Sequence, residues 1–136
     1  MADIFALQGP AGSGKTAALI LLLEKLQEKY PEAAVEYLIR GRRDFKVVVR
    51  GVKGKNIGIE SQGDPNSRLE QSLADFISWK CGIIFCACRT NGMTVDWVSA
   101  MSPPHRVRFV PKTRSSVRQS AVNLDDALRM LKEAGL

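Results

Sequence analysis

The sequence contains 136 residues, of which 45% are hydrophobic and 25% are charged, and its formal net charge is +6. This length and composition suit a soluble globular protein, so we expect residues 1–136 to form a single domain around one core. The apolar run at residues 17–23 is too short to cross a bilayer, and the N-terminus shows no basic stretch followed by a long apolar segment. We therefore expect a cytoplasmic protein with no membrane partner.

The first half of the chain predicts four strands and one helix. Residues 4–7 predict a short buried strand, and residues 17–26 predict a helix that follows a glycine-rich turn. Further strands are predicted at residues 34–39, 45–50 and 56–61. Residues 51–55 contain two glycines and read as a hairpin connection, so one of the two strands that they join runs antiparallel.

The second half predicts three helices and two strands. Ser67 and Glu70 form a capping box before a helix whose apolar side chains at positions 69, 73, 76 and 77 share one face. The continuous apolar run at residues 82–88 predicts a central parallel strand covered on both faces. A short helix at residues 94–101, a strand near the sheet edge at residues 106–110 and a last helix capped by Asn123 complete the chain.

This alternation of strands and helices is typical of a three-layer α/β/α sandwich with a mostly parallel sheet. We expect about five or six strands, including one antiparallel hairpin strand. Right-handed crossovers bring the carboxyl ends of the parallel strands to one edge of the sheet, and ligands bind at that edge. The loops that follow the predicted strands are therefore the candidate site.

The three cysteines, Cys81, Cys86 and Cys88, lie in or beside the central apolar run. Cysteine in such a run behaves as a small buried hydrophobe, so we expect all three to be buried and reduced. A metal site at Cys86 and Cys88 would need a second ligand pair, and the sequence offers none nearby.

Basic residues concentrate in two segments, residues 40–55 and 106–118. Together these segments hold twelve of the 20 basic residues and one of the 14 acidic residues. They are candidate surfaces for a nucleic-acid or protein partner, although a merely solvated surface would have the same composition. The sequence does not indicate an oligomeric state.

The most specific motif lies between the first predicted strand and the first predicted helix. It has the pattern G-x-x-x-x-G-K-[ST] and consists of Gly9, Pro10, Ala11, Gly12, Ser13, Gly14, Lys15 and Thr16. The glycines let the backbone curl so that its N–H groups and the start of the helix face an anion. Lys15 would add positive charge at the β- and γ-phosphates, and the Thr16 hydroxyl suits Mg²⁺.

Through this motif, the Walker A motif, the chain resembles the P-loop NTPases over its first fifth. The resemblance implies a single P-loop nucleotide-binding domain, which would hold a nucleoside triphosphate through residues 9–16 and Ala17. No N/T-K-x-D segment for guanine recognition follows the later apolar strands, so ATP is the nucleotide that we expect, together with Mg²⁺.

A carboxylate is needed to hold water on Mg²⁺ or to position a nucleophile, and Glu60 and Asp64 are the candidates. Both follow the strand at residues 56–61, but Gly58 interrupts its apolar run and the first acid is Glu60, so the match to a Walker B motif is imperfect. We leave the metal and catalytic roles open between Glu60 and Asp64. The alternative is that they are a surface glutamate and an aspartate that precedes a helix.

Arginines in the same loops could stabilise charge on a transferred phosphoryl group. Arg89 is the first candidate because it directly follows the predicted central strand, although it could equally be a solvated arginine. Arg42 and Arg114 are weaker candidates for the same role.

Three functions are compatible with these motifs. The first is a Mg²⁺-dependent ATPase, in which Lys15, Arg89 and one of the two acids carry out hydrolysis. The second is a small P-loop kinase that transfers the γ-phosphate to a nucleoside, nucleotide or other small acceptor. The third is a non-enzymatic nucleotide-binding module that recruits nucleic acid or a protein, which the imperfect Walker B motif favours.

Overall fold

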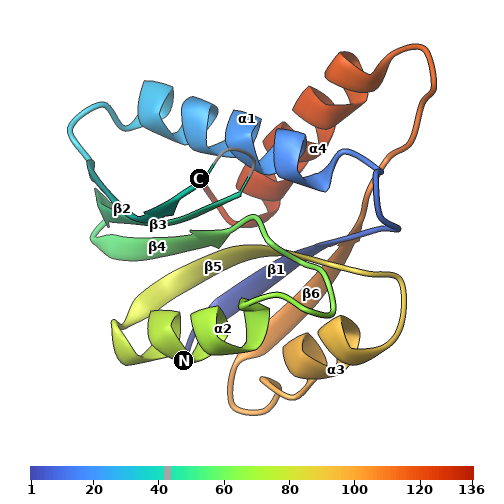
Figure 1. Ribbon diagram of the computed structural model, residues 1–136. Helices are drawn as coiled ribbons and strands as arrows, with labels where there is room; N and C mark the ends of the chain where they lie inside the picture. The colour runs from blue at the N-terminus through green and yellow to red at the C-terminus, as the bar shows by residue number, and fades with distance from the viewer. Residues whose placement is uncertain (42–43) are drawn as a thin grey trace.

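In the computed structural model, which describes residues 1–41 and 44–136, a six-stranded sheet separates two layers of helices (Figure 1). Helices α1 (Lys15–Lys29) and α4 (Gln119–Glu133) cover one face. Helices α2 (Leu69–Ser78) and α3 (Met93–Ser99) cover the other face. The prediction of a three-layer α/β/α sandwich is therefore confirmed.

The strand order confirms a mostly parallel sheet with one antiparallel strand. The strands are β1 (Asp3–Gln8), β2 (Ala34–Arg40), β3 (Phe45–Val52), β4 (Lys55–Glu60), β5 (Cys81–Cys88) and β6 (Arg106–Pro111). They are arranged in the order β2-β3-β4-β5-β1-β6. Strand β3 pairs antiparallel with both β2 and β4, whereas β4, β5, β1 and β6 are parallel. The beginning of β3 therefore lies at the edge where the other strands end.

Two helix starts differ from the predictions. Helix α4 begins at Gln119, so Asn123 lies inside the helix, one turn after its start, and does not cap it. The residue that precedes α2 is Arg68 and not Ser67, and the Ser67 hydroxyl instead accepts a hydrogen bond from the Leu69 N–H at 3.2 Å. Before α4 the Ser115 hydroxyl accepts a hydrogen bond from the Arg118 N–H at 3.0 Å, and before α2 the Gln62 side-chain oxygen accepts one from the Arg68 N–H at 3.2 Å. Neither contact belongs to the predicted capping patterns.

The core has two apolar layers, one on each face of the sheet. Phe5 and Phe85 pack with 5.6 Å between ring centroids beneath α1 and α4, and Phe76 of α2 packs against the other face of the sheet. Strand β5 is buried along almost its whole length, as expected for a central strand. A Cβ at Gly58 would lie 2.6 Å from the Phe76 ring, so the glycine that interrupts β4 makes room for this aromatic side chain.

The three cysteines are free and buried within this core, as predicted. Burial raises the pKa of Cys81 and of Cys88 to about 11, so both thiols stay protonated at neutral pH. Such thiols are poor nucleophiles and poor metal ligands, which agrees with a packing role. Among the described residues, no helix is long and apolar enough to span a bilayer.

Candidate functional site

The loop between β1 and α1 curls tightly at the carboxyl edge of the sheet. Gly12 and Gly14 have positive φ angles of 72° and 95°, which side chains with a Cβ rarely adopt. The Gly9 N–H donates to the Cys88 carbonyl at 3.1 Å, which ties the start of the loop to the end of β5. The Ser13 hydroxyl donates to the Pro10 carbonyl at 2.7 Å, which closes the curl.

Lys15 lies inside this curl and is only 8% exposed. Its ammonium group donates to the carbonyl oxygens of Gly9 at 2.5 Å and Pro10 at 2.9 Å. Burial lowers the Lys15 pKa, and the nearby Arg89 charge lowers it further, while Asp64 acts in the opposite direction. A positive charge is thus held in place where an incoming anion would restore its ordinary pKa.

An open cavity of about 700 Å³ lies over the loop. Its walls come from the phosphate-binding motif and α1, from the segment before β3, from the segment after β4, and from α4. The lining residues are residues 11–17, Ile20, Asp44, residues 61–64, Gln119 and Asn123. The cavity therefore joins the predicted loop to residues from three other parts of the chain.

Asp64 is one of the two predicted carboxylates, and it lines this cavity. It is paired with Arg89, whose Nη2 and Nε atoms lie 2.9 and 3.1 Å from Asp64 Oδ1. The Arg89 backbone N–H donates to the buried Thr94 hydroxyl at 2.9 Å, which fixes the start of the loop after β5. The structure therefore brings Lys15, Asp64 and Arg89 together.

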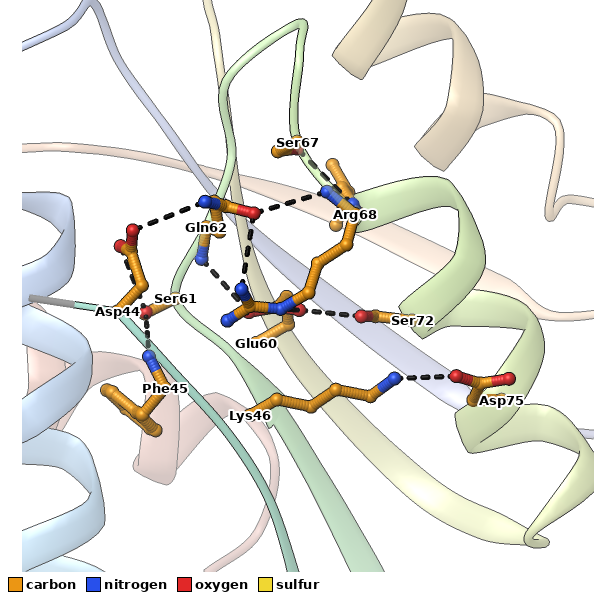
Figure 2. A network of polar contacts seen from close by, with 11 residues as sticks. Asp44, Phe45, Lys46, Glu60, Ser61, Gln62, Ser67, Arg68, Ser72 and Asp75 are labelled. Carbon is orange, nitrogen blue, oxygen red and sulfur yellow. Dashed lines mark hydrogen bonds and ion pairs between the residues drawn. The ribbon is translucent and has the colours of Figure 1, made fainter. Parts of the chain in front are cut away.

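Glu60, the other predicted carboxylate, is placed differently: it is fully buried and does not line the cavity. Figure 2 shows its carboxylate between Arg68 and Ser72. Arg68 donates to it through Nε at 2.7 Å and Nη2 at 2.9 Å, and the Ser72 hydroxyl donates at 2.6 Å. The Gln62 N–H adds a fourth hydrogen bond at 3.2 Å. These donors leave little capacity for a metal ion or a water molecule.

Asp44 also faces the cavity, and the sequence analysis did not select it. Gln62 Nε2 lies 3.3 Å from Asp44 Oδ2, and the Ser61 hydroxyl accepts a 2.8 Å hydrogen bond from the Phe45 N–H beside it (Figure 2). Asp44 reaches this edge because it precedes β3, the antiparallel strand. The predicted hairpin was the signal that could have identified it, since an antiparallel strand begins where its parallel neighbours end.

The remaining predicted arginines fall in two places. Arg114 lines a hollow of about 420 Å³ that adjoins the loop, together with Gly12, Ser13 and Gln119. Arg42, like Arg43 beside it, lies outside the described residues. Lys112 is buried in an ion pair with Asp126 at 2.9 Å and so does not reach the cavity.

The residues at the cavity fit a magnesium ion that arrives with a phosphate ligand. The described residues contain no group of three or more His, Cys, Asp or Glu side chains that could hold a metal by themselves. Thr16 and Asp64 line the same cavity, and both offer the oxygen donors that Mg²⁺ prefers. Magnesium commonly binds through one or two carboxylates plus substrate phosphates and water, which matches this sparse donor set.

No protein-family model matches the sequence. Among solved structures, the chain is similar to that of a human cancer-related nucleoside triphosphatase. The two are 14% identical, the match covers 98% of this chain and 99% of the other, and the TM-score is 0.47. This similarity is too low to establish a common function.

Proposed function

We propose that the protein is a single P-loop domain that binds ATP with Mg²⁺ and hydrolyses it. One observation carries this proposal: residues 9–16 form a tight curl whose lysine ammonium, held by two loop carbonyls, lies at the floor of an open cavity. Backbone N–H groups at such a curl and at the start of α1 would bind the phosphates. Thr16 and Ala17 would complete this binding segment.

Binding would exchange the partners of Lys15. The ammonium group would leave the carbonyls of Gly9 and Pro10 and contact oxygens of the β- and γ-phosphates. Arg89 lies near Lys15 and Asp64, so its guanidinium would stabilise the charge that develops on the γ-phosphate.

Hydrolysis needs a water molecule in line with the bond from the γ-phosphorus to the bridging oxygen. Asp64 is the carboxylate best placed to accept a hydrogen bond from that water, because it lines the cavity and is 62% exposed at its side chain. Thr16 and Asp64 would hold Mg²⁺, which supplies positive charge to the phosphate oxygens. The water oxygen bonds to phosphorus, the bridging oxygen leaves with ADP, and the water proton passes to solvent.

A second function, phosphoryl transfer to a small acceptor, is favoured by Asp44. Asp44 lines the same cavity as Asp64, and its carboxylate could accept the proton of an acceptor hydroxyl. The cavity of about 700 Å³ also extends past the loop toward this residue.

Release of ADP from ATP and Mg²⁺ tests these functions, measured with and without a pool of nucleosides and nucleoside monophosphates. Lys15→Ala is the blank, and Lys25→Ala, an exposed lysine on the same helix, is the matched control. Equal release with and without the pool supports the ATPase, and release that requires the pool establishes a kinase instead. Release no greater than that of Lys15→Ala refutes both enzymatic functions and leaves a nucleotide-binding module.

The same assay tests the two basic segments. If they bind nucleic acid, added single-stranded RNA or DNA will raise the rate, and the increase will fall steeply as salt concentration rises. An unchanged rate with either polymer argues against a nucleic-acid-coupled ATPase.

A further inference from the structure

Asn123 is a buried polar side chain that the proposed hydrolysis does not use. It lies on α4, is 7% exposed and lines the cavity over the phosphate-binding loop. Its Oδ1 atom has no hydrogen-bond partner among the residues that the structure describes. It packs against the loop itself, because a Cβ at Gly14 would lie 2.7 Å from this oxygen. Buried polar atoms nearly always have partners, so this one needs an explanation.

A rigid framework holds Asn123 beside the loop. Asp126 follows it on α4 and is 1% exposed. The Asp126 carboxylate accepts hydrogen bonds from the Thr113 N–H at 2.9 Å and the Thr113 hydroxyl at 2.7 Å. It also forms ion pairs with Lys112 and Arg129, each at 2.9 Å. This network ties α4 to the end of β6, so the part of α4 that carries Asn123 is fixed relative to the loop before any ligand binds.

A second amide lies on the same side of the helix. Gln119 precedes Asn123 by four residues, which places the two on one helix face, and both line the cavity. Gln119 also lines the adjoining hollow of about 420 Å³, whose other walls include Arg114, Ser115 and Ser116. The two spaces share Gly12, Ser13 and Gln119, so the cavity continues from the loop past the start of α4 toward residues 114–116.

The strand order sets the direction in which a nucleotide would lie. Asp64 and Arg89 follow β4 and β5, on one side of β1, whereas α4 follows β6, on the other side. A triphosphate whose γ-phosphate faces Arg89 therefore directs its nucleoside toward Asn123 and Gln119.

We propose that Asn123, flanked by Gln119, recognises the base of the nucleotide and selects adenine over guanine. This inference rests on the proposed nucleotide binding. Adenine presents an acceptor, N7, beside a donor, the N6 amino group, and the side-chain amide of asparagine matches both. Guanine presents two acceptors, N7 and O6, so the amide oxygen would remain without a donor. In the structure Oδ1 is buried against the loop, so a rotation of the amide about its Cβ–Cγ bond would bring its oxygen and nitrogen to face the base together.

The test measures by calorimetry the affinities of ATP, GTP, 7-deaza-ATP and inorganic tripolyphosphate for the wild-type protein and for Asn123→Ala. We expect ATP to bind the wild type roughly tenfold or more tightly than GTP, since one bidentate pair gives that discrimination. Asn123→Ala should weaken ATP binding by roughly tenfold to a hundredfold and leave tripolyphosphate unchanged. The substitution should weaken 7-deaza-ATP binding much less, because that analogue lacks the N7 acceptor.

Leu128→Ala, a change to an exposed side chain on the same helix, is the matched control and should bind every ligand as the wild type does. If Asn123→Ala fails to fold, the wild-type affinities for ATP, GTP and 7-deaza-ATP decide the question alone. Equal affinities for these three nucleotides would overturn base recognition, while continued tripolyphosphate binding would leave the phosphate site standing. Failure of the wild type to bind tripolyphosphate or ATP would overturn both proposals, and Lys15→Ala gives that baseline.

Discussion

Glu60 and Asp64 are four residues apart and follow the same strand, yet their carboxylates have opposite surroundings. Each is paired with an arginine, Glu60 with Arg68 and Asp64 with Arg89. The Glu60 side chain is 0% exposed and accepts hydrogen bonds from four donors. The Asp64 side chain is 62% exposed, and within the described part of the chain its carboxylate accepts hydrogen bonds from Arg89 alone. The two acids are therefore suited to different roles, although the sequence presents them as equals.

The difference shows how an ion pair can serve either structure or chemistry. Removing one partner from a buried pair leaves an uncompensated charge, so such a pair holds its neighbours in fixed positions. An exposed pair contributes little to stability and can exchange partners when a ligand arrives. We therefore assign the water and metal role proposed above to Asp64, and a supporting role between β4 and α2 to Glu60.

The largest effect is expected from Glu60→Ala, which breaks the buried pair. The variant leaves Arg68 without its partner and removes the acceptor of the Ser72 hydroxyl, so the free energy of unfolding should fall by about 3–5 kcal/mol. Urea denaturation measures this fall. Glu36→Ala is the matched control, because Glu36 pairs with Arg50 at the surface and should contribute less than about 1 kcal/mol. Similar losses in the two variants would contradict the structural role of Glu60.

Asp64→Asn should have the reverse effect: a large loss of activity and a small loss of stability. ATP hydrolysis should fall roughly tenfold to a hundredfold, because the amide is a weaker partner for Mg²⁺ and for the attacking water. The free energy of unfolding should change by less than about 1 kcal/mol, since the lost pair is exposed. Steady-state rates and urea denaturation of one preparation compare the two quantities. A normal rate in this variant would remove Asp64 from the proposed mechanism.

Arg89→Gln should change the response of Lys15 to pH. Burial and Arg89 hold the folded-state pKa of Lys15 below 10.5, so the ammonium group loses its proton, and its attraction for phosphate, at a lower pH than an ordinary lysine does. Binding of tripolyphosphate should weaken as pH rises through that lowered pKa. In Arg89→Gln, the decline should begin at higher pH, and calorimetry over a pH series measures the difference.

The contribution of Lys15 to protein stability should change in the opposite direction in the same pH range. The folded state disfavours charged Lys15, so the contribution of Lys15 to the free energy of unfolding should rise with pH between the lowered pKa and 10.5, against the fall that Cys81 and Cys88 cause above 9.0. Arg50→Gln, which removes an arginine of the surface pair, is the control for binding and should leave the pH profile of tripolyphosphate binding unchanged. An identical decline of binding in wild type and Arg89→Gln would argue against coupling of Arg89 to Lys15.

The smallest effect is expected from Asp75→Asn, because Asp75 is partly exposed and the asparagine side-chain oxygen can still accept the hydrogen bond from the buried Lys46. A 2.6 Å hydrogen bond from Lys46 is the main cause that lowers the Asp75 pKa below 3.8, and Gln71 adds to it. The resulting stability is present above 3.8 and is lost as pH falls through the lowered pKa. The variant should therefore lose less than about 1 kcal/mol at neutral pH and show a flatter decline in acid. An unchanged acid profile in urea denaturation would contradict this account.

Local patterns predicted the fold because they encode burial directly. The apolar run at residues 82–88 could only be covered on both faces, and it forms most of β5 at the centre of the sheet. The tight turn at residues 9–16 was equally predictable, because its glycines and the flanking strand and helix agree with one another, while its binding of phosphate stays a prediction. The interruption at Gly58 was harder to interpret, since its cause is the Phe76 ring from a helix eleven residues later in the chain.

The rest of the site depends on contacts between distant residues. The different roles of Glu60 and Asp64 could not be predicted without the position of Arg68, which directly precedes α2 and pairs with Glu60. Asn123 lies in a sequence context typical of a helix cap. Because α4 begins four residues earlier, at Gln119, Asn123 instead lies inside the helix and against the loop. The position of Asp44 could not be predicted without the strand order, because Asp44 lies near the loop only when β3 runs antiparallel to its neighbours.

The position of Lys15 gives the phosphate-binding loop an internal competitor for its own ligand. In the folded protein the ammonium group already has two carbonyl acceptors, so any anion must displace an existing set of hydrogen bonds. The affinity then reflects the difference between the hydrogen bonds of Lys15 to the anion and those to the two carbonyls, and not the full strength of a lysine–phosphate contact. Small singly bound anions gain little from such an exchange, whereas a polyphosphate gains several contacts at once. Under the proposed function, the loop would therefore favour extended phosphate chains over inorganic phosphate, even though inorganic phosphate carries the same chemical group.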